Sequence, residues 1–81
     1  MAQVQLWGSL AAAAGGRSVV EIAAKDISEL FRKLAEQYPA TQAFIDNGVA
    51  VSIGGTIYRD NWSQPLPEGA EIFLLPRIAG G

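Results

Sequence analysis

The spacing of hydrophobic residues predicts two β-strands near the start of the chain. Polar and apolar residues alternate over residues 3–7, and residues 18–23 are rich in β-branched side chains. Both patterns are typical of half-buried strands, and we expect the two segments to pair as a hairpin. The stretch 9–16 between them holds four alanines and closes with two glycines, which predicts a helical turn or loop. The inward-facing positions are Val4, Leu6, Val20 and Ile22, and Trp7 faces outward.

One longer segment has the period of a helix. Asp26 followed three residues later by Glu29 resembles a capping box, and Pro39 ends the pattern. Between them, apolar residues recur at helical spacing and form a stripe that can pack on a sheet. The stripe consists of Ile27, Leu30, Phe31, Leu34 and Tyr38. The charged residues of the opposite side are Arg32, Lys33 and Glu36. We interpret that side as a solvated face.

The second half of the chain predicts three further strands separated by turn signals. Residues 41–46 are compatible with one more short helical turn before these strands. The turn signals are Asn47-Gly48, Gly54-Gly55 and a loop that contains Pro65, Pro67 and Gly69. The strands that follow these signals are residues 49–53, 56–59 and 72–75, and Pro76 ends the last one.

The order of the elements indicates one fold class. Strand, strand, helix, strand, strand, strand in a short chain is typical of an α+β protein with a β-grasp, ubiquitin-like fold. We expect a mixed sheet of about five strands with one main helix packed across it. We expect residues 1–76 to form this domain and residues 77–81 to form a flexible tail. The predicted core consists of Val4, Leu6, Val20, Ile22, Leu30, Leu34, Val51, Ile72 and Leu74.

The composition argues against self-contained chemistry. The chain of 81 residues has no cysteine and no histidine, so it lacks thiolate ligands, a thiol nucleophile and the commonest general base. Its six basic residues are scattered and its net charge is -2, which argues against nucleic acid as a partner. We therefore expect no metal site and no catalytic residues of its own.

The hydropathy pattern does not indicate membrane insertion or export. No apolar run approaches the roughly 20 residues of a membrane span. The apolar stretch 6–14 is not preceded by a basic residue and is interrupted by Gly8 and Ser9, unlike a signal peptide. We expect a cytoplasmic protein without a membrane partner.

The C-terminal part of the chain carries a family resemblance. Pro65-Leu66 leads to Glu68-Gly69-Ala70-Glu71, then to an apolar strand, and the chain closes with Pro76-Arg77-Ile78-Ala79-Gly80-Gly81. In these motifs and in its order of elements, the chain resembles the MoaD/ThiS family of ubiquitin-like sulfur carriers over essentially its whole length. The resemblance is strongest to the MoaD branch. Of three Gly-Gly pairs only the last follows the final strand at the terminus, so its position carries the specificity.

This resemblance implies that the working group is the C-terminal carboxylate of Gly81. An E1-like adenylating enzyme (MoaB/MoeB/ThiF-like) would use ATP to adenylate Gly81, and a sulfur donor would displace AMP to leave a thiocarboxylate. The carrier would bind no cofactor and would act as a cosubstrate rather than an enzyme. The acceptor would be a biosynthetic enzyme such as the large subunit of molybdopterin synthase. The residues that thread into these partners would be Arg77, Ile78, Ala79 and Gly80.

An apolar surface beside the tail is a second candidate site. Alternation in the last strand turns Phe73 and Leu75 away from the core, and Trp7 joins them if the first and last strands are neighbours. Such a patch suits docking of the activating enzyme and of the acceptor, as the family resemblance also implies. The alternative is that loops partly cover these side chains, since single exposed apolar residues are normal.

Three other functions stay open from the sequence. The same carrier chemistry would serve thiamine thiazole formation or another sulfur-transfer pathway. A protein modifier would instead form an isopeptide bond between Gly81 and a lysine of a target. A plain β-grasp interaction module would have an inert tail, which is the usual behaviour of chain ends.

Overall fold

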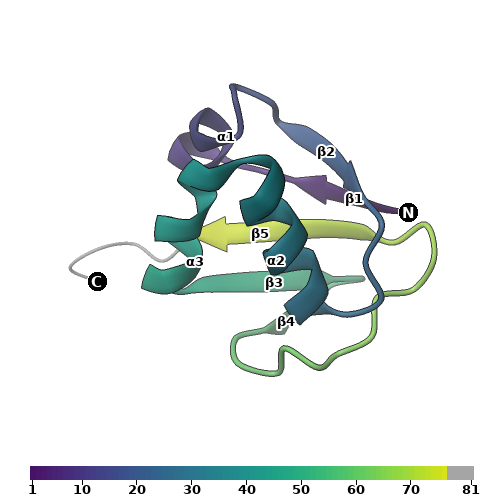
Figure 1. Ribbon diagram of the computed structural model, residues 1–81. Helices are drawn as coiled ribbons and strands as arrows, with labels where there is room; N and C mark the ends of the chain where they lie inside the picture. Colours follow the sequence, from purple (N-terminus) through teal and green to yellow (C-terminus); the bar gives the residue numbers. More distant parts are fainter. Residues whose placement is uncertain (77–81) are drawn as a thin grey trace.

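A five-stranded mixed sheet, crossed by a helix on one face, forms the body of the protein (Figure 1). The computed structural model describes residues 1–76. The strands are β1 (Ala2–Gln5), β2 (Val19–Ile22), β3 (Val49–Ile53), β4 (Thr56–Tyr58) and β5 (Glu71–Pro76). The helices are α1 (Gly8–Ala13), α2 (Ile27–Gln37) and α3 (Gln42–Asn47), and the 3-10 turn η1 (Pro39–Thr41) precedes α3. This architecture confirms the predicted β-grasp fold.

The last strand of the chain lies in the middle of the sheet. The strand order is β2-β1-β5-β3-β4. β1 runs parallel to β5 with Val4 opposite Ile72, and it pairs antiparallel with β2, which confirms the predicted hairpin. On the other side, β3 pairs antiparallel with both β5 and β4. β5 therefore has a hydrogen-bonded neighbour along each of its edges.

The core lies between the sheet and α2. All nine residues predicted for the core are buried, because alternate strand positions and one helix stripe face each other across the same interior. Each large aliphatic side chain buried there contributes about 1.5–3 kcal/mol relative to exposure. The further buried apolar residues are Ala2, Leu10, Ala14, Ile27, Phe31, Val49 and Leu66. Tyr38, the last residue of the predicted stripe, is only half-buried.

The strand boundaries agree with the sequence expectations except at the first strand. The strand over 49–53 has the predicted limits. The observed strands differ from the predictions over 18–23 and 72–75 by one residue at each end, and from the prediction over 56–59 by one residue at its C-terminal end. The first strand ends at Gln5 rather than at residue 7. The reason is that Trp7 is the N-cap residue of α1, so the chain leaves the sheet there.

The short helices are more regular than the sequence indicated. α1 is a six-residue helix, and Gly15 follows its C-cap with a φ of 73°, a conformation that favours glycine. η1 and α3 occupy residues 39–47, where a single turn over 41–46 was expected. Thr41 joins them; its buried hydroxyl donates to the carbonyl oxygen of Tyr38 over 2.7 Å.

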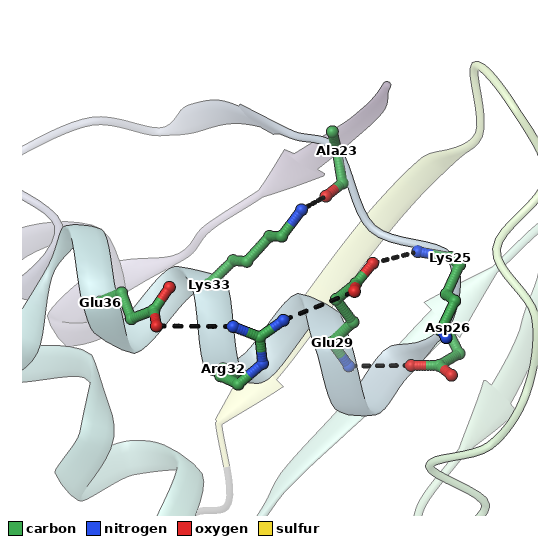
Figure 2. A network of polar contacts seen from close by, with 7 residues as sticks. All are labelled: Ala23, Lys25, Asp26, Glu29, Arg32, Lys33 and Glu36. Atoms are coloured by element: carbon green, nitrogen blue, oxygen red, sulfur yellow. Dashed lines mark hydrogen bonds and ion pairs between the residues drawn. The ribbon is translucent and has the colours of Figure 1, made fainter.

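The start of α2 is fixed by its own side chains (Figure 2). The Asp26 carboxylate accepts a hydrogen bond from the backbone N–H of Glu29 at 2.8 Å. The Glu29 carboxylate reaches back to the backbone N–H of Lys25 at 2.9 Å, one residue before the usual position in a capping box. The predicted N-terminus of this helix is therefore confirmed.

The loop after β4 closes over the same end of α2. The backbone N–H groups of Ile27 and Ser28 donate to the carbonyl oxygens of Gln64 and Trp62, at 3.2 and 2.9 Å. The Trp62 ring also meets the Phe31 ring edge-on, with 5.0 Å between the centroids. The two hydrogen bonds satisfy N–H donors of the first turn, which have no acceptor within the helix itself.

The cap makes a prediction about stability. Replacing Asp26 by Ala leaves the N–H of Glu29 without its acceptor, and we expect the free energy of unfolding to fall by about 1 kcal/mol. Urea unfolding followed by far-UV circular dichroism measures this change. Glu36→Ala is the matched control, because it removes an exposed carboxylate from the same helix and should cost at most about 0.5 kcal/mol. Equal losses in the two variants would contradict a specific role for the cap.

Candidate functional site

The predicted tail begins at the end of the central strand. β5 ends at Pro76, which is the register partner of Val49. Proline has no N–H to donate to a neighbouring strand, which is consistent with the end of the strand at this residue. The tail residues singled out from the sequence lie outside the described residues: Arg77, Ile78, Ala79, Gly80 and Gly81. The described part of the candidate site is the end of the body that leads into the tail.

The sheet face that points away from α2 carries the predicted docking residues. Val4 and Ile72 are buried register partners, so Gln5 and its partner Phe73, one position further along, lie on the opposite face. Leu75 lies two positions beyond Phe73 on that face and is 37% exposed. Phe73 is half-buried. The sequence prediction that Phe73 and Leu75 face away from the core is confirmed.

Trp7 lies at the same end of the sheet. It follows Gln5 by two residues, and Gln5 is the register partner of Phe73 in the neighbouring strand. The first and last strands are therefore neighbours, which is the condition under which Trp7 joins Phe73 and Leu75. The Trp7 side chain is 57% exposed, although the residue caps α1 rather than extending β1.

Two exposed residues on the outer face escaped the sequence analysis. Val19 is 42% exposed on β2, and Ile57 is 49% exposed on β4. The register joins them into one row across the sheet, which runs Val19, Gln5, Phe73, Ser52, Ile57. Val19 precedes the buried Val20 and Ile57 is the register partner of Ser52, so both lie on the outer face, and the strand order shows that they flank Phe73. We call the set Trp7, Val19, Ala50, Ile57, Phe73 and Leu75 the apolar patch.

The outward side of α2 has a different character (Figure 2). The Arg32 guanidinium donates to the carboxylates of Glu29 and Glu36, each at 3.4 Å. The Lys33 ammonium donates to the backbone carbonyl oxygen of Ala23. These groups pair with one another and two of them, Arg32 and Glu36, are exposed, which confirms the predicted solvated face. A surface whose charges are already paired offers less to a partner than the apolar patch does.

The described body contains few groups that could perform chemistry. Within residues 1–76, no three side chains of histidine, cysteine, aspartate or glutamate gather where they could hold a metal ion. A shallow hollow on α3 is lined, among the described residues, by Ala43, Phe44, Asp46 and Asn47. Those four described residues include one carboxylate and no second acid or base. None of the helices in this part of the chain is long and apolar enough to cross a membrane.

Solved structures share this fold over nearly the whole chain. Small archaeal modifier protein 1 from Methanosarcina acetivorans matches with a TM-score of 0.84 at 23% identity, covering 99% of this chain and 95% of that one. CysO from Mycobacterium tuberculosis matches with a TM-score of 0.80 at 13% identity, covering 96% and 100%. A chain from the complex of subunits 1 and 2 of the molybdopterin-converting factor from Helicobacter pylori 26695 matches with 0.68 at 25% identity, covering 99% and 97%.

Two comparisons at the level of sequence gave different results. The search of curated proteins finds no match. The family model described as ThiS family matches residues 4–81, which includes the second half of β1 and all of β2, β3, β4 and β5 and continues through the Gly-Gly terminus. Because that match spans almost the entire chain, the protein belongs to the ThiS family.

Proposed function

We propose that this protein is a sulfur carrier whose reactive group is the C-terminal carboxylate of Gly81. The observation that carries the proposal is the family match, which extends over the body and through residue 81. A terminal carboxyl group has a reference pKa of about 3.3–3.7, so it is an anion at neutral pH and a poor electrophile. It must be activated before it can accept sulfur.

Activation divides into two displacements. A carboxylate oxygen of Gly81 attacks the α-phosphorus of ATP in an E1-like adenylating enzyme, and pyrophosphate leaves. Sulfide, the simplest sulfur donor, then attacks the acyl carbon, the C–O bond to AMP breaks so that AMP leaves, and a thiocarboxylate results. The carrier supplies no acid or base to either step, in keeping with a chain that has no histidine and no cysteine. It acts as a renewable cosubstrate and not as an enzyme.

The architecture suits delivery of that terminus. Five residues follow Pro76, and fully extended they reach about 17 Å beyond the sheet. The last two lack side chains, so the backbone can pass through a narrow channel that a Cβ would obstruct. β5 anchors the tail between two hydrogen-bonded neighbours, which gives the partner a fixed point from which the chain enters.

The acceptor we favour is the large subunit of a molybdopterin synthase. Support comes from the similarity to a chain of the Helicobacter pylori complex, whose two subunits belong to the molybdopterin-converting factor. A thiamine thiazole pathway or another sulfur-transfer route would use the same Gly81 chemistry. We place the activity in the cytoplasm, where ATP and a sulfur donor reach the activating enzyme, and we assign the carrier no bound cofactor.

Protein modification is the second candidate. Small archaeal modifier protein 1 from Methanosarcina acetivorans is among the similar structures, which favours considering it. A modifier would pass the adenylated Gly81 to a lysine amine and form an isopeptide bond. Trypsin would cut after Arg77 and leave Ile-Ala-Gly-Gly on the acceptor lysine. Such branched peptides in a digest of total protein would favour modification over sulfur transfer.

The carrier chemistry is tested by intact mass. After incubation with a purified E1-like enzyme, ATP and a sulfur source, we expect one oxygen of the untagged protein to be exchanged for sulfur, localised to Gly81 by fragmentation. A variant that lacks Gly81 should keep its fold and stay unmodified, because its new terminus does not reach the reacting position. Unchanged mass of the wild type with an enzyme that activates another carrier would overturn the proposal.

The narrow-channel argument predicts the effect of bulk in the tail. Gly80→Val adds a branched side chain next to the reacting residue, and we expect kcat/KM for adenylation to fall about 100-fold. Ala12→Val adds similar bulk on the exposed side of α1 and should leave the rate unchanged. Pyrophosphate release measures both. Adenylation of the Gly80 variant at the wild-type rate would mean that the channel is wide.

The apolar patch predicts a separation of binding from stability. Phe73→Lys and Leu75→Lys place a charge on the outer face, and we expect the Kd for the adenylating enzyme to rise about tenfold or more. The free energy of unfolding should change much less, because neither side chain lies in the core. Titration calorimetry and urea unfolding measure the two quantities. Arg32→Ala, on the helix side, is the control that should leave Kd unchanged; a loss of folding without an effect on binding would contradict the docking role.

A further inference from the structure

Two carboxylates occupy the end of the outer face that is remote from the tail. Glu21 on β2 and Glu71 on β5 are both register partners of Gln3 on β1. Their neighbours along each strand, Ile22 and Ile72, are buried, so the two carboxylates point away from the core. Both residues are exposed, and about 9.5 Å separates the strands that carry them.

These carboxylates have no cationic partner within the described body. The ion pairs among residues 1–76 join Met1 to Glu68, and Arg32 to Glu29 and Glu36. Glu71 accepts only a long hydrogen bond of 3.5 Å from the amide of Gln5, a neutral group on the same face. The outer face therefore presents two negative charges that the body does not neutralise, in contrast to the paired charges along α2.

The opposite end of the same sheet carries cations. Arg17 precedes β2 by two residues and Arg59 follows β4 directly, so both lie at the end where β5 finishes and the tail begins. Both are exposed and belong to none of the ion pairs of residues 1–76. The charge thus changes from negative at Glu21 and Glu71, through the apolar patch, to positive at the two edges of the sheet level with Leu75, where Arg17 and Arg59 lie.

We propose that this change of charge along the sheet fixes the direction in which the adenylating enzyme docks. The matching surface of that enzyme carries cationic side chains opposite Glu21 and Glu71, and apolar side chains opposite the apolar patch. It carries acidic side chains opposite Arg17 and Arg59, next to the mouth of the channel. The inference rests on the proposed function, because it names the chemistry of a partner that the function requires.

Size and charge together support this assignment. Five strands of about five residues offer a face on the order of 400 Å², which is half of the roughly 800 Å² that each partner contributes to a standard interface. A patch this small with apolar contacts alone would allow more than one orientation. Rotating the partner by half a turn would bring like charges together at both ends, which is costly and keeps the tail away from the channel.

The test inverts the charge along the sheet without changing the net charge. The swapped variant combines Glu21→Arg and Glu71→Arg with Arg17→Glu and Arg59→Glu, and it keeps the formal charge of -2. We expect its KM as substrate of the adenylating enzyme to rise about tenfold or more, with kcat nearly unchanged, because charges at the edge of an interface act mainly on encounter and orientation. Pyrophosphate release at low and high salt measures both constants, and high salt should reduce the difference.

The matched control exchanges Arg32 and Glu36 on the solvated side of α2, which also conserves net charge. Its KM should stay within about twofold of the wild type, since exposed ion pairs contribute little. The two half-variants, one at each end of the outer face, separate the contributions if the full swap folds poorly. Equal KM values for the swap, the half-variants and the control would overturn the inference while wild-type turnover upheld the function. No turnover of the wild type would overturn both.

Discussion

The parallel pairing of β1 with β5 is the interaction on which the rest of the structure depends. It brings the two ends of the described chain into adjacent strands and puts the last strand in the middle of the sheet. Val4 and Ile72 meet in this pairing and form the floor on which α2 packs. Without this pairing, β2 and β3 would not belong to one sheet, and the tail would follow an edge strand.

The two sides of the molecule differ in how far their polar groups are paired. On the helix side, Arg32 pairs with two carboxylates and the start of α2 is capped, so polar groups there are satisfied within the chain. On the outer face, apolar side chains and two carboxylates remain open to solvent. A body that satisfies its polar groups on one side and leaves the other unpaired is suited to transient association through that open side.

Much of this arrangement could be predicted from the sequence because its signals are local. Every core position that alternation and helical spacing predicted is buried. Asp26 with Glu29 correctly marked the start of α2. The apolar patch was only half anticipated: Val19 and Ile57 join it through strand order, which no single strand encodes. The contact between Trp62 and Phe31 was missed for the same reason, since an irregular loop carries no period that points to its partner. The roles of Gly80 and Gly81 come from family membership and chemistry, not from packing.

The position of β5 also has a mechanical consequence. A force applied to the C-terminus acts along the axis of a strand that is bonded to β1 on one edge and to β3 on the other. Sliding such a strand breaks the backbone hydrogen bonds of two ladders together, whereas an edge strand pulled along its axis is held by only one. The body can therefore resist the pulling force when its terminus is withdrawn from a tight channel. The same molecule can then be used again without unfolding between one delivery and the next.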